Sequence, residues 1–324
     1  MKKILILGGT QFVGRTLVER LDELGHYEIT LFNRQQTGSN LFSHLKKIKG
    51  DRETSDINQL KNKTWDVVID VSAYYPKSLQ NLLEILKGNI NRYIFISTIS
   101  VYNLENEIIG TIKEDFETLS CTLSQSMDTS LSTYGNRKAE CERVLQNATY
   151  LDKIILRPSL IYGKYDPTDR FYYWLYRANQ KQPMIMPNGG KDKITLTYIT
   201  DLVDIIIQSI SIKKHSTTYN ATTYKPFPLN EMLFYMDKNA KMVNIDSKLL
   251  FEKNVLPGKD IPLWFDTDLE IDNGQLFQDF KPKVTEFGQS VLDTTAFYES
   301  LNWPIPITGM SGDREKEILK WVNY

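Results

Sequence analysis

Short, continuously apolar runs alternate with amphipathic segments of helical length through the first half of the chain. Because polar residues do not interrupt these runs, they indicate strands buried on both faces. Helices between such strands indicate a parallel sheet covered by helices on both sides. The expected strands are 4–7, 28–32, 46–49, 65–71, 92–97 and 153–157, and the expected helices are 12–24, 56–61, 77–86, 134–147 and 201–210.

This alternation breaks down after the sixth expected strand, where aromatic residues and prolines become frequent. We therefore expect an α/β fold with two domains. Residues 1–160 should form a doubly wound parallel sheet of the Rossmann type. Residues 161–324 should form a smaller, mixed C-terminal domain that mainly binds substrate. The segment 195–221 is expected to return to the first domain.

A glycine-rich turn follows the first apolar run. A strand, a tight glycine turn and a helix start together direct helix N-terminal amides at a phosphate, which predicts a dinucleotide site. Gln11 stands where the usual G-x-x-G-x-x-G spacing has its middle glycine, so a side chain enters the pyrophosphate turn. The alternative is a plain glycine-rich turn. The residues expected to contact the cofactor here are Gly8, Thr10, Gln11, Phe12, Val13 and Gly14.

Three further residues are expected near the adenosine part of the dinucleotide. Asn33 ends the second strand, where an acid commonly binds the adenosine ribose of NAD. Asn33 does not repel a phosphate, and its neighbour Arg34 can donate a forked hydrogen bond to a 2′-phosphate. We therefore expect NADP as the cofactor, with NAD as the alternative. The simpler interpretation of Arg34 is a solvent-facing loop residue. Asp51, after the third strand, is expected to accept from the adenine amino group or to be a turn residue.

Tyr134 and Lys138 open a predicted helix four residues apart and therefore share one face of it. An ammonium near a phenol lowers the phenol's pKa from its usual ~10, and such a tyrosine can act as a general acid or base. The spacing is common by chance. However, the preceding strand ends in the hydroxyl residues Ser97 and Thr98, at the sheet edge where parallel sheets bind ligands.

Three motifs, GGTQFVG, ISTISVY and YGNRK, together resemble the short-chain dehydrogenase/reductase superfamily, in its extended branch, the NAD-dependent epimerase/dehydratase family. The segment RPSLIYG is similar to another motif of that family, and the resemblance covers residues 1 to about 210. Within this family, the glycine turn resembles that of an atypical subgroup with the pattern GGTxFxG. The resemblance implies Tyr134 as general acid/base, Lys138 as the residue that holds the nicotinamide ribose and Thr98 as the residue that binds the reacting oxygen. It implies that Ser72, Ala73 and Ser97 also lie at the cofactor.

The function that this resemblance implies is an NAD(P)-dependent oxidoreductase or epimerase acting on a nucleotide-sugar or another small hydroxyl or carbonyl compound. The segment Thr98-Ile99-Ser100 lacks the Asp-Glu pair typical of sugar-nucleotide dehydratases, so dehydration ranks lower. Arg170 is a candidate for an anionic substrate group, with a salt bridge to Asp166 or Asp169 as the alternative. A rival of another class is a non-catalytic dinucleotide-binding regulator, or an RNA-binding protein as in chloroplast relatives with this turn.

The composition of the chain limits the classes of partner that we expect. The formal net charge is −1, and no basic stripe interleaved with aromatic residues is present, so we expect neither nucleic acid nor an anionic membrane surface as a partner. Two cysteines are too few for a disulfide framework and fit a cytoplasmic location. Three dispersed histidines predict no metal site, and no segment approaches the ~20 apolar residues of a membrane helix. A homodimer remains an open expectation.

Overall fold

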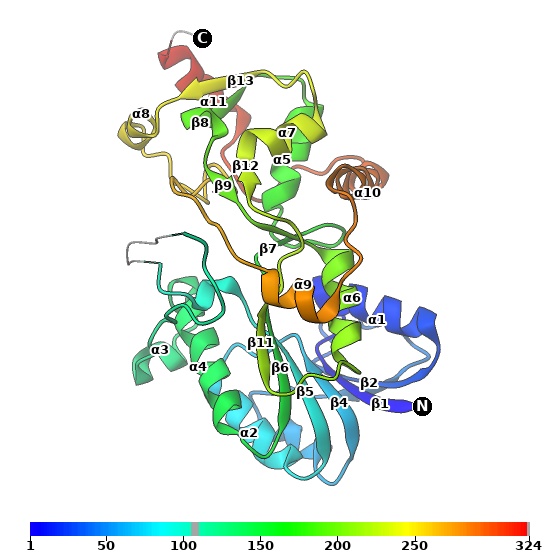
Figure 1. The fold of residues 1–324 in the computed structure, drawn as a ribbon. Helices are drawn as coiled ribbons and strands as arrows, with labels where there is room; N and C mark the ends of the chain where they lie inside the picture. The colour runs from blue at the N-terminus through cyan, green and yellow to red at the C-terminus, as the bar shows by residue number, and fades with distance from the viewer. Residues whose placement is uncertain (105–109, 323–324) are drawn as a thin grey trace. The chain divides into compact units, whose positions relative to one another are not determined.

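The computed structural model describes residues 1–104 and 110–322 and contains a seven-stranded parallel sheet (Figure 1). The strand order is β11-β6-β5-β4-β1-β2-β3, and every neighbouring pair is parallel. This arrangement confirms the expected Rossmann-type fold and adds the edge strand β11, which the apolar pattern did not indicate. The strands are β1 (Lys2–Leu7), β2 (Tyr27–Asn33), β3 (Lys46–Lys49), β4 (Trp65–Asp70), β5 (Ile90–Ile96), β6 (Asp152–Arg157) and β11 (Thr217–Asn220).

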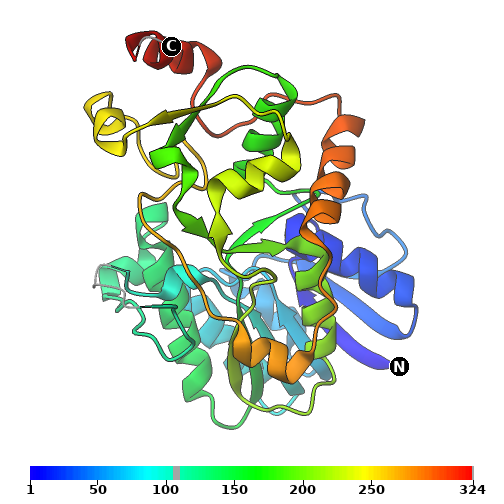
Figure 2. The same cartoon turned by 45° about the horizontal axis from the view of Figure 1, so that its top comes forward.

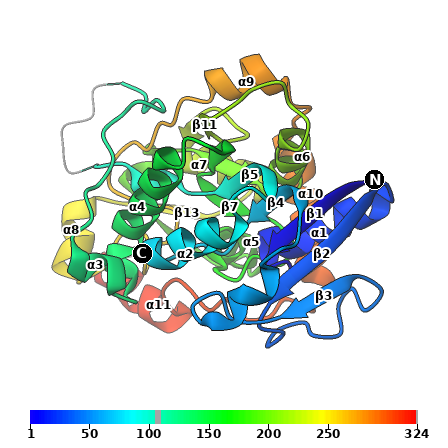
Figure 3. The same cartoon turned by 90° about the horizontal axis from the view of Figure 1, so that it is seen from below.

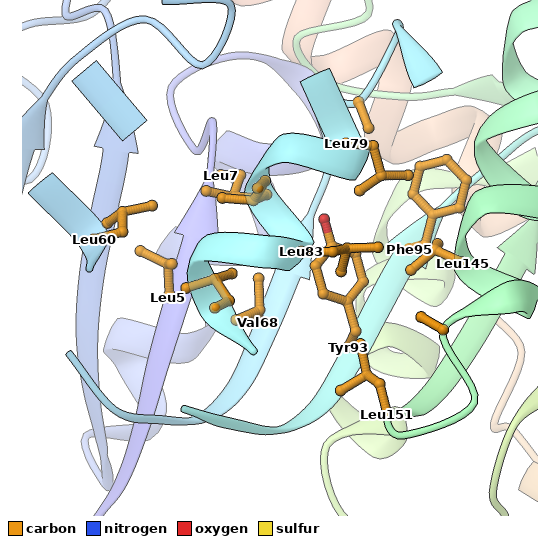
Figure 4. Packing of buried hydrophobic residues seen from close by; sticks show 14 of the residues in the cluster. Leu5, Leu7, Leu60, Val68, Leu79, Leu83, Tyr93, Phe95, Leu145 and Leu151 are labelled. Atoms are coloured by element: carbon orange, nitrogen blue, oxygen red, sulfur yellow. The ribbon is translucent and has the colours of Figure 1, made fainter. Parts of the chain in front are cut away.

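Helices cover both faces of this sheet (Figure 3). On one face α2 (Pro76–Leu86) packs against α4 (Tyr134–Asn147), and on the other α1 (Phe12–Leu24) packs against α6 (Ile199–Ser209). Alternate residues of each strand point to opposite faces, so one strand serves two cores. The core under α2 and α4 contains the side chains shown in Figure 4, among them Leu5, Leu7, Val68, Leu79, Leu83, Phe95 and Leu145.

Helix α1, strand β3 and helix α4 begin and end at the residues expected from the sequence. The end of α1 has a clear local cause: Gly25 adopts φ 67°, and its amide donates to the carbonyl of Asp22. The expected helix at 56–61 is instead a short 3-10 helix, η1 (Ser55–Leu60). Between β5 and α4 the described residues include three short pieces, η2 (Ile99–Val101), α3 (Leu123–Met127) and η3 (Leu131–Thr133).

The chain divides into two compact units. Unit 1 contains the parallel sheet and comprises Met1–Ser159, Ile199–Thr222 and Asp272–Pro282. The last of these segments, which carries α9 (Gly274–Phe280), was not part of the expected first domain. Unit 2 comprises Leu160–Tyr198, Thr223–Ile271 and Lys283–Tyr324.

Unit 2 contains three small two-stranded sheets (Figures 1 and 2), and its buried side chains are both aliphatic and aromatic. Strand pairs β7/β10 and β8/β13 are parallel, whereas β9/β12 is antiparallel. Phe171 and Trp174 of helix α5 are buried, as expected for core aromatics. The helices and strands of unit 2 are β7 (Leu160–Tyr162), α5 (Arg170–Asn179), β8 (Met184–Pro187), η4 (Asn188–Gly190), β9 (Lys193–Ile194), β10 (Leu196–Tyr198), β12 (Phe227–Pro228), α7 (Leu229–Met236), β13 (Met242–Ile245), α8 (Ser247–Glu252), α10 (Phe287–Ser300) and α11 (Gly312–Trp321).

Candidate active site

The glycine turn between β1 and α1 has the geometry of a phosphate cradle. Gly8 and Gly9 adopt φ 109° and 97°, a conformation that side chains rarely allow. A Cβ on Gly14 would lie 2.8 Å from the amide nitrogen of Gly9, so the helix can approach the turn this closely only with glycine there. The residues of this turn therefore fit the pyrophosphate of a dinucleotide, with main-chain amides as donors.

Gln11, the residue that departs from the glycine pattern, lies beside this cradle at the start of α1. It is the N-cap of α1, with an extended backbone, an exposed side chain and no side-chain hydrogen bond to the helix. The first amides of α1 are therefore not covered by a side-chain cap. Phe12 has φ 35° and is half-buried, whereas the Val13 side chain is buried, which leaves Val13 only its main chain for a cofactor.

The residues expected at the adenosine have mixed surroundings. The Asn33 amide donates to the carbonyl of Gly8 at 2.7 Å and accepts from the Gln35 amide, so Asn33 ties β2 to the glycine turn. The Arg34 side chain is 60% exposed, and its guanidinium lies 4.0 Å from the Asp51 carboxylate. Arg34 and Asp51 thus lie close enough to contact one adenosine, and Arg34 is free to turn toward a phosphate.

A buried ion pair that the sequence motifs did not predict lies next to the glycine turn. Asp70 ends β4, is fully buried and accepts from the Arg52 guanidinium at 2.7 Å. The Tyr93 hydroxyl donates to the other carboxylate oxygen at 2.5 Å. Burial alone would raise the pKa of Asp70, but the charge of Arg52 and these hydrogen bonds hold it below its usual value. A carboxylate at the end of an apolar strand was the only sequence signal for this pair.

This pair supports the loop after β4, where Ser72 and Ala73 were expected to contact the cofactor. The Ser72 amide donates to Asp70, and its hydroxyl donates to the carbonyl of Leu7 at the end of β1. Ala73 is buried, and its carbonyl accepts from Lys138 at 3.0 Å. The ends of β1 and β4 and helix α4 are therefore joined by direct hydrogen bonds.

The three proposed catalytic residues come from the end of β5 and the first turns of α4. Thr98 is half-buried, and its hydroxyl caps η2 by accepting from the Ser100 amide at 3.1 Å. Tyr134 is the first residue of α4 and half-buried, with its ring centroid 6.2 Å from that of Tyr74. Lys138 follows one turn later and is only 3% exposed. The structure thus brings Lys138 to the strand ends of the sheet, with Tyr134 one turn away on the same helix face.

Lys138 is held firmly at the strand ends. Its ammonium donates to the carbonyls of Ala73 and Ile96, at 3.0 and 2.7 Å, and lies 4.0 Å from the centroid of the Phe95 ring. Burial lowers the pKa of Lys138 to about 8. Because an ammonium has three donors, one N–H remains for a ribose hydroxyl.

Ser97, which was expected at the cofactor, uses its hydroxyl elsewhere. That hydroxyl donates to the Glu142 carboxylate at 2.5 Å, and the same carboxylate pairs with Arg157 at the end of β6. These side chains are at most 4% exposed. A contact of Ser97 with a cofactor is thereby limited to its main chain. Arg170 lies in unit 2 and donates to the Thr168 hydroxyl. The described residues include no salt bridge between Arg170 and Asp166 or Asp169, although its charge acts on Asp166.

Residues 1–104 and 110–322 contain no cluster of three or more His, Cys, Asp or Glu side chains that could hold a metal ion. In the same residues, no helix is both long and apolar enough to cross a membrane.

Comparison with known proteins assigns the family. The model of the NAD dependent epimerase/dehydratase family matches residues 4–222, which include the whole glycine turn and the ISTISVY and YGNRK motifs. The chain belongs to this family. Membership confirms the resemblance drawn from the three motifs and the expectation of an enzyme class that uses a nicotinamide dinucleotide. The GGTxFxG subgroup remains a prediction.

The individual proteins that resemble this chain share less than 30% of their aligned residues with it. The chloroplast stem-loop binding protein of 41 kDa b from Arabidopsis thaliana is 28% identical over 232 residues, which cover 66% of this chain and 57% of that protein. The chain therefore spans a little over half the length of this relative. UDP-glucuronic acid 4-epimerase from Bacillus cereus, solved with NAD, superposes with a TM-score of 0.71 at 18% identity, covering 94% of this chain and 99% of that one.

A second solved structure gives the same result for the fold. UDP-N-acetylglucosamine 4-epimerase from Methanobrevibacter ruminantium, in complex with UDP-N-acetylmuramic acid, has a TM-score of 0.71 at 19% identity and covers 93% of this chain and 99% of that one. At such identities the likeness establishes the fold along nearly the whole chain.

Proposed function

We propose that this protein is an NAD(P)-dependent epimerase or oxidoreductase of the extended short-chain type that acts on a nucleotide-sugar or another small hydroxyl or carbonyl compound. The observation that carries the proposal is the position of Lys138, whose ammonium donates to the carbonyl of Ala73, in the loop after β4, and to the carbonyl of Ile96, at the end of β5. The same helix carries Tyr134 one turn earlier, and Thr98 follows the end of β5.

In this proposal Tyr134 exchanges a proton with the substrate hydroxyl or carbonyl oxygen. Thr98 donates a hydrogen bond to that oxygen, and Lys138 holds the nicotinamide ribose while its positive charge favours the phenolate of Tyr134. A bound nicotinamide would supply the hydride chemistry. A lysine buried in this way is held at a fixed location, so it can orient a ribose without losing much conformational entropy. Nucleotide-sugars as the substrate class are supported by the two epimerases that share the fold.

The finer choice of cofactor rests on Arg34. Asn33 carries no charge, and the exposed Arg34 guanidinium can donate to a 2′-phosphate, which supports NADP. Asp51, 4.0 Å away, would compete for Arg34, and the similar epimerase from Bacillus cereus was solved with NAD, so NAD is the alternative.

The mass and fluorescence of the dinucleotide that copurifies with the protein would test this function. Tightly bound NAD(H) would support an epimerase, because the cofactor is then regenerated within one turnover. Exchangeable NADPH would support a reductase. A protein that neither copurifies with a dinucleotide nor binds added NADH or NADPH would contradict both versions.

A second candidate function is RNA binding, since the Arabidopsis relative is a stem-loop binding protein. The formal net charge of −1 argues against it, because phosphate contacts dominate affinity for RNA. Binding of an RNA stem-loop at physiological salt, weakening steeply as salt rises, would support this alternative. Turnover of a sugar nucleotide without such binding would exclude it.

A further inference from the structure

Helix α4 is attached to the end of β5 at two consecutive residues. Lys138 donates to the carbonyl of Ile96 at 2.7 Å, and Glu142 accepts from the hydroxyl of Ser97 at 2.5 Å. Lys138 and Glu142 are four residues apart and share one helix face. Both are buried, at 3% and 2% exposure. The residue that follows this double attachment is Thr98.

The Glu142 carboxylate has a fixed orientation. The Arg157 guanidinium binds it as a fork, with Nε 3.0 Å from Oε1 and Nη2 2.6 Å from Oε2. Arg157 is itself fixed, because Nη1 donates at 2.9 Å both to the Tyr102 hydroxyl and to the carbonyl of Glu114. Forked, charge-assisted bonds are strong and directional. Ser97 therefore meets an acceptor that cannot follow it if the strand end shifts.

We propose that Glu142 is a positioning residue that acts through Ser97 to set the place of the Thr98 hydroxyl relative to Tyr134. This inference rests on the proposed function. Thr98 has an extended backbone, φ −167° and ψ 153°, so it continues directly from the strand that Ser97 anchors. A shift of Ser97 is thus passed to its neighbour. A misplacement of about 1 Å at a reacting group can lower a rate by about a hundredfold.

The choice of variant matters, because replacing Glu142 would leave the Arg157 charge buried and unpaired, and the protein could fail to fold. Ser97→Ala removes only the hydroxyl that transmits the effect. Thr30→Val is the matched control. Thr30 lies in the middle of β2, is fully buried, and its hydroxyl has no hydrogen-bond partner among the described residues.

The kinetic test is a double-mutant cycle of Ser97→Ala with Thr98→Ala, using UDP-glucuronic acid and NAD(P) as probes. We expect Ser97→Ala to lower kcat about a hundredfold while the Kd for the dinucleotide stays within about twofold. In the Thr98→Ala background the same change should alter kcat by less than about twofold. Thr30→Val should leave kcat unchanged. An equal loss from Ser97→Ala in both backgrounds would overturn the proposal.

A second readout does not depend on activity. Crystal structures of the wild type and of Ser97→Ala should differ by about 1 Å in the position of the Thr98 hydroxyl relative to the Tyr134 hydroxyl. An unmoved Thr98 would also overturn the proposal. If the wild type turns over no sugar nucleotide, the proposed function fails in this assay, whereas the crystal structures still decide whether Glu142 and Ser97 position Thr98.

Discussion

Gly14→Ala should damage the cofactor cradle directly. The added Cβ would lie 2.8 Å from the nitrogen and 2.9 Å from the Cα of Gly9, where ordinary contacts are 3.4–4 Å. Because both neighbours are backbone atoms, helix α1 and the turn must separate. Overpacking of this kind costs about 1–3 kcal/mol. If most of that cost falls on the geometry that the dinucleotide needs, affinity drops about tenfold to a hundredfold.

Fluorescence titration with NADH and NADPH, together with thermal unfolding, measures both effects. Gly25→Ala is the matched control, since Gly25 ends the same helix at φ 67° and an added Cβ has open space, with its nearest neighbour 4.0 Å away. Gly25→Ala should cost about 1–2 kcal/mol of stability, from left-handed backbone strain, and leave affinity unchanged. Wild-type affinity in Gly14→Ala, or equal affinity losses in both variants, would refute the proposed cradle.

Two other predictions concern charge. Arg34→Ala should weaken NADPH binding about tenfold and leave NADH binding unchanged, because only a 2′-phosphate needs the guanidinium; equal effects in a fluorescence titration would exclude this role. Burial raises the pKa of Asp166 from 3.8 to about 6, a difference worth about 3 kcal/mol. The folded state binds the extra proton, so stability falls as pH rises from about 4 to about 6. Asp166→Asn should therefore be more stable than wild type above pH 6 and similar at pH 4 in denaturant unfolding; parallel pH profiles would contradict this.

Much of the fold could be predicted because its signals are local. Apolar runs predicted the five inner strands β1, β2, β4, β5 and β6, the short edge strand β3 was predicted as well, and the expected end of α1 lies directly before Gly25. Strand β11 was missed because its sequence, TTYN, has no apolar run, and it forms only by pairing with β6. Segment 272–282 was missed for a related reason, since its membership of unit 1 depends on contacts with residues distant in sequence.

In the candidate site, too, local features could be predicted from the sequence and contacts between distant residues could not. The spacing of Tyr134 and Lys138 is a helical property, so the sequence could predict their shared face. The pairs Arg52–Asp70 and Arg157–Glu142 depend on which strand ends become neighbours, and the sequence offered only charged residues beside apolar runs. Ser97 was expected at the cofactor because its partner in α4 could not be foreseen.

Turnover by a Tyr134→Phe variant tests the central claim most directly. The variant removes one hydroxyl and keeps the ring beside Tyr74. With a sugar nucleotide that the wild type converts, we expect kcat to fall by about a hundredfold to ten-thousandfold, the usual contribution of a general acid or base. The Kd for the dinucleotide should stay within about twofold, because Lys138 and the glycine turn are unchanged. Wild-type kcat in Tyr134→Phe would contradict the account.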